Sequence, residues 1–146
     1  MATTNPQADL SAQLAAQAPN GGFQTAKAVY SFAADGGVQG TITPKRTVSL
    51  PKNAVIVGGS INSTTAFTSD GSATLAVGTS AGSSTTAILG ATAKASLSAN
   101  ALINAVPVWA TPVKLSAAGN ITVTIATADA TAGVVEITLL YYVANA

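Results

Sequence analysis

The chain has 146 residues, of which 48% are hydrophobic and 8% charged, and its formal net charge is +1 at neutral pH. It contains no histidine and no cysteine, so it lacks the usual general base, the usual soft nucleophile and the common ligands of zinc and redox metals. This composition excludes most enzyme classes. Ordinary globular proteins have about 25% charged residues, so the scarcity here indicates a surface covered by neighbouring subunits or coated with serine and threonine hydroxyls.

Residues 1–24 differ in composition from the rest and are predicted to form an N-terminal arm. Residues 9–18 are good helix formers, Leu10 and Leu14 lie one helical turn apart, and PNGG at residues 19–22 ends any helix. Because so short an isolated helix is marginal in water, the arm is expected either to be flexible or to become ordered only against a partner subunit. No secretory signal and no membrane-spanning segment is expected from this sequence.

Residues 25–146 are predicted to form one β-sandwich domain, because apolar and polar residues alternate from Thr25 onward. An apolar run over residues 54–57 predicts a buried strand that Gly58 and Gly59 bulge or bend. SDGS at residues 69–72 predicts a hairpin turn. Further strands of the first half are expected at residues 27–32, 47–50, 60–67, 73–78 and 85–93.

The second half of the domain follows the same pattern. Residues 91–102 fit either a short alanine-rich helix or an irregular crossing segment, and PVWATP at residues 107–112 is expected to be extended because of its two prolines. Residues 120–125 and 134–143 alternate, and the latter is expected to be the longest strand. Leu140 and Tyr142 make the outer side of that strand apolar near its end, which indicates cover by another element or another chain. The seven or eight short strands predict an all-β fold, an antiparallel β-sandwich of jelly-roll-like type.

Few residues of this sequence could take part in catalysis or bind a metal ion or a phosphate. Of the five carboxylates, Asp35, Asp70 and Asp129 fall in predicted turns, where aspartate commonly bonds to the backbone. Neither a calcium-binding run of aspartates nor a phosphate-binding glycine motif is present. We therefore predict no catalytic residue, no metal ligand and no cofactor, and we expect that the protein is not an enzyme.

The candidates for partner contact are Lys45, Arg46, Lys52 and Trp109. The three basic residues either mark solvated strand ends or contact an acidic protein surface, since they are too few for a nucleic-acid-binding stripe. Trp109 fits a core residue, an interface anchor or a platform for stacking a sugar. No nucleic-acid or membrane partner is expected.

The pattern of residues 27–143 resembles the capsid decoration, or cement, proteins of tailed bacteriophages. The resemblance is carried by KAVYSFAADGG, SLPKNAVIVGGSINSTTAF, SDGSATLAVGTSAG, VPVWATPVKLSAAGNITVTIA and TAGVVEITLLYYV. It implies a β-sandwich or jelly-roll subunit on the outer surface of the virion capsid, commonly a homotrimer. Such a subunit bridges neighbouring copies of the major capsid protein and has no catalytic residues.

Two alternative functions stay open at this point. One is a carbohydrate- or receptor-binding fibre domain in which Trp109, Tyr141 and Tyr142 form a stacking platform. The other is a different virion component, such as a tail protein.

Overall fold

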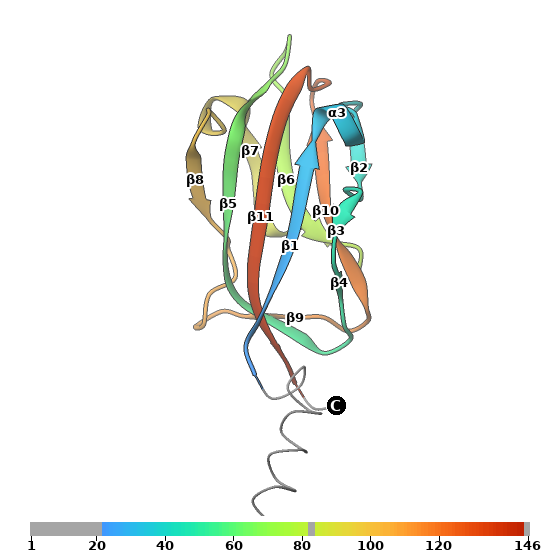
Figure 1. Cartoon of the computed structure of the whole chain (residues 1–146), viewed down its shortest axis with the longest axis vertical. Helices are drawn as coiled ribbons and strands as arrows, with labels where there is room; N and C mark the ends of the chain where they lie inside the picture. The colour runs from blue at the N-terminus through green and yellow to red at the C-terminus, as the bar shows by residue number, and fades with distance from the viewer. Residues whose placement is uncertain (1–21, 82–83, 145–146) are drawn as a thin grey trace, which may run out of the picture.

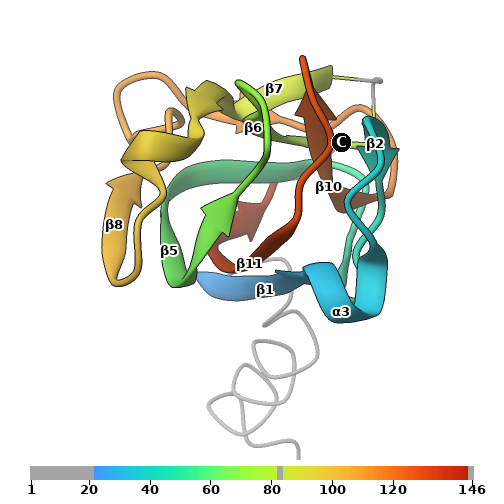
Figure 2. The ribbon, with the colours of Figure 1, turned by 90° about the horizontal axis from the view of Figure 1, so that it is seen from above.

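The computed structural model describes residues 22–81 and 84–144. In this part of the chain, two antiparallel β-sheets pack face to face, as the views in Figures 1 and 2 show. The prediction of an all-β antiparallel sandwich is therefore confirmed. The predicted arm falls mainly on residues 1–21, which lie outside the described residues, and the first strand begins at Gln24.

The first sheet has the strand order β3-β1-β11-β5-β8, with β9 also paired to β5, and the second has the order β2-β10-β6-β7, with β4 also paired to β10. The first sheet consists of β1 (Gln24–Ser31), β3 (Arg46–Thr47), β5 (Ala54–Thr68), β8 (Ala101–Asn104), β9 (Val113–Lys114) and β11 (Ala132–Val143). The second consists of β2 (Gly40–Ile42), β4 (Ser49–Leu50), β6 (Thr74–Thr79), β7 (Ser84–Ala93) and β10 (Gly119–Ala126). The short helix α3 (Phe32–Asp35) follows β1, and the 3₁₀ turn η2 (Lys94–Ser96) follows β7.

The core lies between the sheets and comes from the alternating residues that the sequence pattern singles out. On β10 the buried hydrophobic residues are Ile121, Val123 and Ile125. On β11 they are Val135, Ile137, Leu139, Tyr141 and Val143. Because successive side chains of a strand point to opposite faces, the intervening residues of both strands lie on the outer faces of the sandwich.

Several connections differ from the sequence prediction because they pass between the sheets. The predicted hairpin at residues 69–72 is wrong, since β5 and β6 belong to different sheets and this turn carries the chain from one to the other. The predicted strand at residues 47–50 is divided between β3 in the first sheet and β4 in the second. The chain crosses at Val48, whose N–H donates to the Lys27 carbonyl at 3.2 Å.

The prediction of the longest strand is wrong for the two long strands that pair at the centre of the first sheet. With 15 residues, β5 is longer than β11, which has 12, so β11 is not the longest strand. The predicted irregularity at Gly58 is confirmed: Leu140 pairs with Gly58 and Tyr141 with Ile56, which leaves Val57 as the extra residue of a bulge.

The prediction that residues 107–112 are extended is wrong, because these residues form a tight turn. Thr111 N–H donates to the Val108 carbonyl at 3.0 Å, and the reciprocal bond measures 3.4 Å. Trp109 lies on this turn and is 66% exposed, which excludes the core position considered for it. Residues 91–102 contain the end of β7, the turn η2 and the start of β8, so this segment is largely an irregular crossing.

Candidate functional site

Three aromatic rings gather at the end of the sandwich where β1 begins and β11 ends (the lower end in Figure 1). Phe23, Trp109 and Tyr142, here called the aromatic cluster, have ring centroids 5.8 Å apart for the two pairs with Phe23 and 6.1 Å apart for Trp109 and Tyr142. Phe23 is 59% exposed, Trp109 is more exposed still, and Tyr142 is half-buried. The rings meet edge to face or tilted, an arrangement that aromatic pairs favour.

The sheet register explains how these rings come together. Gln24 pairs with Tyr141, so Phe23 lies beside Tyr142 on the outer face of the first sheet. On the other side of Tyr142 the cross-strand partner is Val55, which in turn pairs with Lys114. Val55 is only 5% exposed although it lies on this outer face, which indicates that the surrounding side chains cover it. The turn at residues 107–112 adds the ring of Trp109.

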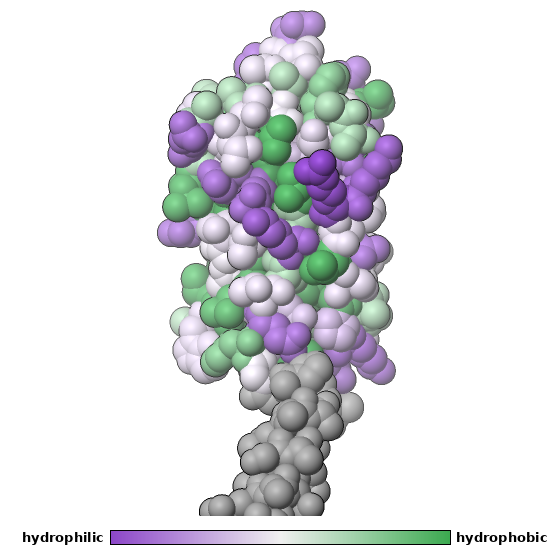
Figure 3. Space-filling model, viewed as in Figure 1, coloured by the Kyte–Doolittle hydropathy of each residue, from purple (hydrophilic) through white to green (hydrophobic). Residues whose placement is uncertain are grey.

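The outer face of the first sheet carries charged side chains of both signs, since Arg46 pairs with Val29 and Lys114 with Val55 on this face. Lys27 Nζ lies 2.9 Å from Glu136 Oε1, an ion pair between neighbouring strands. Figure 3 shows this side of the molecule, with small green and purple areas separated by large pale ones. The pale colour marks residues of intermediate hydropathy.

The opposite end of the sandwich is held by polar side chains that bind backbone groups. The Asp35 carboxylate accepts the N–H of Ser31 at 3.0 Å and that of Lys45 at 2.8 Å. The hydroxyl of Tyr30 donates to the Gly36 carbonyl at 2.7 Å. Burial, and secondarily the neighbouring Asp35 carboxylate, raise the pKa of Tyr30 to about 12.

A second group of such contacts lies at the same end. Asp129 accepts the N–H of Gln39 at 3.0 Å, and the Ser69 hydroxyl donates to the Asp129 carbonyl at 2.6 Å. Lys94 Nζ donates to the Ser69 carbonyl at 2.7 Å. The carboxylates of Asp35 and Asp129 both bind backbone N–H groups, as predicted, but Asp35 is the last residue of helix α3 rather than part of a turn.

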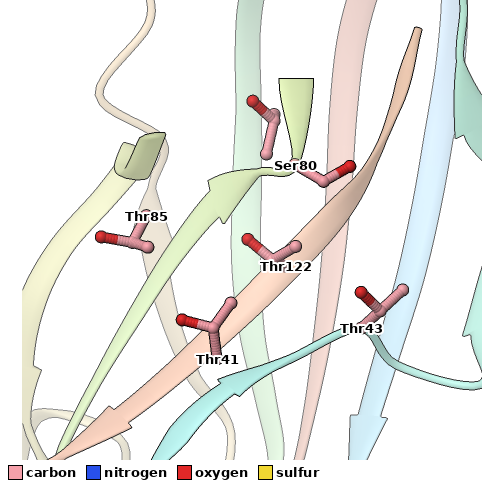
Figure 4. Close-up of a pocket in the computed structure, with 6 residues that line it drawn as sticks. Thr41, Thr43, Ser80, Thr85 and Thr122 are labelled. Atoms are coloured by element: carbon pink, nitrogen blue, oxygen red, sulfur yellow. The ribbon is translucent and has the colours of Figure 1, made fainter. Parts of the chain in front are cut away.

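A pocket of about 300 Å³ on the second sheet is lined by hydroxyl side chains from β2, β6, β7 and β10 and from the residues that directly follow β2 and β6 (Figure 4), namely Thr41, Thr43, Thr79, Ser80, Thr85 and Thr122. The start of β7 passes so close to β6 that a Cβ at Gly78 would collide with the backbone of Ser84. Thr122 is 3% exposed, and its hydroxyl has no hydrogen-bond partner among the described residues. None of these side chains titrates, so the pocket can form hydrogen bonds but offers no acid–base chemistry.

The structure does not bring the four predicted contact residues together. Lys45 and Arg46 are exposed and lie beside the Asp35 end, where Lys45 N–H binds Asp35. Lys52 is exposed in the turn between β4 and β5, at the end that also carries Trp109. Their role as partner contacts stays a prediction.

Sequence reasoning missed two features of these surfaces. Phe23 was assigned to the arm, although extending the alternation of β1 back from Lys27 and Thr25 places it on the outer face. The hydroxyl pocket has no signal in the sequence, since it depends on the close approach of β7 to Gly78.

Two further features are absent from the residues that the structure describes. No group of three or more acidic residues that could hold a metal ion occurs there. Within the same residues, no helix has the length and hydrophobicity needed to cross a membrane.

Comparison with known proteins finds similarity in structure but not in sequence. No protein-family model matches the chain, and no curated protein sequence matches it. A chain from the acid-stable capsid structure of Helicobacter pylori bacteriophage KHP30 matches with a TM-score of 0.60 and 14% identity, covering 84% of this chain and 89% of that one. A chain from the capsid asymmetric unit of cyanophage Pam1 matches with a TM-score of 0.60 and 15% identity, covering 83% and 84%.

A chain from the capsid of Ralstonia phage GP4 matches with the same TM-score of 0.60 and 17% identity, covering 87% of this chain and 88% of that one. The sandwich fold is thus shared with chains found in phage capsid structures. At these identities the similarity concerns the fold, and a shared fold does not by itself assign a function.

Proposed function

We propose that this protein is a structural component of a tailed-bacteriophage virion that decorates the outer surface of the capsid. In this role it binds the major capsid protein, bridges neighbouring capsid subunits and stabilises the shell, and it performs no catalysis. The observation that carries the proposal is the fold shared with chains of three phage capsid structures, over at least 83% of this chain and 84% of each of those chains.

The physical properties of the chain support this role. A net charge of +1 leaves little electrostatic repulsion between copies or against a neighbouring protein. We further propose that the protein acts as a homotrimer, because several modest contacts made at once sum to stable attachment.

Labelling of intact virions tests the proposal directly. Antibodies raised against the purified protein, applied to virions of the phage that encodes it, are expected to label the outside of the heads in immunogold electron microscopy. Heads stripped of the protein should recover the label when it is added back. Label confined to tails, or no label on intact or reconstituted heads, would show that the proposed location is wrong.

The exposed basic residues at the Asp35 end are the proposed contact with an acidic surface of the capsid. Lys45→Gln is expected to weaken binding to stripped heads about tenfold, and Arg46→Gln to act in the same direction, because each removes a cation from a rim contact. Lys52 lies at the end that carries Trp109, so Lys52→Gln tests whether that end also contacts the capsid. Lys27→Gln is the matched control, since it removes the same charge from an exposed side chain on β1 that pairs with Glu136 rather than with the Asp35 end. Equal weakening by the control would mean that net charge, rather than this contact, governs binding.

A second candidate function is binding of a carbohydrate receptor, which the exposed aromatic cluster favours. The platform differs from the predicted one: Tyr141 is 7% exposed and belongs to the core, so Phe23 joins Trp109 and Tyr142 instead. Saccharides that stack on Trp109 should change its fluorescence. A glycan array with no binding, together with unchanged fluorescence, would leave no support for this function.

A further inference from the structure

We propose that the aromatic cluster binds the N-terminal segment, residues 1–21, of a second copy of this chain. The inference rests on the proposed function, since it names the contact through which decorating copies would hold one another. Its test uses the free protein and does not require a capsid.

The chemistry of the aromatic cluster favours an apolar occupant. Phe23 and Trp109 expose more than half of their surface, while the hydroxyl of Tyr141 at the same end donates to Gln24 Oε1 at 3.3 Å. Exposed aromatic residues that pack on one another are typical of binding hot spots. The rings carry no charge and no carboxylate lies in their cross-strand row, so the cluster suits apolar side chains better than a polar ligand.

The position of Phe23 in the sequence favours the N-terminal segment as that occupant. Residues 1–21 lead directly to the cluster, because Phe23 is one of its members. Within that segment, Leu10 and Leu14 form an apolar pair at helical spacing. Leu14 is nine residues from Phe23, which gives a reach of up to about 30 Å in an extended chain. A segment leaving one cluster can therefore reach the cluster of a neighbouring copy.

Charge complementarity favours the same occupant. Asp9 is the only charged side chain of the N-terminal segment and directly precedes Leu10. Lys114 is exposed and pairs with Val55, next to Tyr142 in the same cross-strand row. Leucines placed on the rings would bring Asp9 near Lys114, whose positive charge favours that carboxylate. If each segment is passed to the next copy around a closed ring, as in a trimer, every cluster gains one occupant and the assembly closes.

Complementation between two full-length variants tests the proposal. Leu10→Ser/Leu14→Ser alters the segment and leaves the cluster intact, whereas Phe23→Ser/Trp109→Ser alters the cluster and leaves the segment intact. Each variant alone is expected to self-associate at least about 30-fold more weakly than the wild type, as for loss of a hot spot. Mixed together they should form a 1:1 complex, measured by analytical ultracentrifugation. Val38→Ser is the matched control, because Val38 is 72% exposed at the opposite end, and it should self-associate like the wild type.

Other occupants of the cluster give different results, and each of these would overturn the proposal. If the segment variant alone associates like the wild type, the cluster contacts another surface. If the wild type is monomeric and the segment variant changes Trp109 fluorescence, the segment binds its own chain. If the mixture forms no complex, the segment does not reach a second copy.

Binding to stripped heads is measured separately, so that the two proposals can fail independently. Complementation without any decoration of heads would refute the capsid function and leave the copy-to-copy contact standing. Decoration of heads by the wild type together with failed complementation would refute this contact and leave the capsid function standing.

Discussion

The two ends of the sandwich use their side chains in opposite ways. At one end, Asp35 and Asp129 accept backbone N–H groups and the Tyr30 hydroxyl donates to a backbone carbonyl. At the other end, Phe23 and Trp109 leave more than half of their surface exposed. A turn that is fully hydrogen-bonded stabilises the fold, whereas exposed apolar rings contribute little until something covers them. The difference predicts that the polar end governs stability and the aromatic end governs association.

The largest effect on stability is expected from Asp35→Ala. The carboxylate accepts two backbone N–H groups, at 2.8 and 3.0 Å, and hydrogen bonds to charged groups are each worth about 1.5–3 kcal/mol. Loss of both should lower the free energy of unfolding by about 3 kcal/mol, measured by urea denaturation. Asp35→Asn should cost less, since its amide oxygen can still accept one bond. A loss below about 1 kcal/mol for Asp35→Ala would contradict the structural role of this end.

The next effect concerns pH and Tyr30. Its pKa of about 12 in the folded state lies above the ordinary value of 10.0, so the unfolded chain loses this proton first as pH rises. The stabilisation is complete below pH 10 and is lost as pH approaches 12, a difference of roughly 2–3 kcal/mol. Tyr30→Phe should remove this dependence. The midpoint of urea denaturation, measured between pH 8 and 12, reports this dependence. If the midpoints of the wild type and of Tyr30→Phe change in parallel with pH, Tyr30 has the same pKa in the folded and unfolded states, which would contradict the prediction.

The sequence was sufficient to predict those strands whose alternation depends only on local spacing. Ile121, Val123 and Ile125 of β10 and the inner residues of β11 are buried as predicted, because a strand buried on one face must alternate. The sequence could not show where the chain changes sheet. The turn at residues 69–72 reverses the chain in either a hairpin or an inter-sheet connection, and only the packing of β5 and β6 in different sheets distinguishes them.

The candidate site was predicted less completely than the fold. Trp109 was recognised as a contact residue, but its exposure depends on the turn between Val108 and Thr111. That turn was not expected, since two flanking prolines favour an extended chain. The gathering of Phe23, Trp109 and Tyr142 depends on the pairing of β1 with β11, a long-range register that local patterns do not encode.

A pair of buried threonines tests whether a hydroxyl stabilises this protein only when it has a partner. Thr79 is 2% exposed and its hydroxyl donates to the Ala81 carbonyl at 2.9 Å, whereas the Thr122 hydroxyl has no partner among the described residues. Thr79→Val is expected to lower the free energy of unfolding by about 1–2 kcal/mol, and Thr122→Val to raise it by about 1 kcal/mol. Urea denaturation measures both. Destabilisation by Thr122→Val would show that this hydroxyl binds something in the pocket.

The smallest effect on the stability of the isolated chain is expected from Trp109→Ala at the aromatic end. Only edge and tilted ring contacts are lost there, so at low protein concentration the free energy of unfolding should fall by less than about 1 kcal/mol. Because association stabilises the folded state by mass action, the Tm of the wild type should rise with protein concentration and that of the variant much less. Scanning calorimetry over a hundredfold concentration range measures this. If the Tm of both proteins depends equally on concentration, the exposed rings take no part in assembly. The contrast between a stabilising polar end and an associating aromatic end would then be wrong.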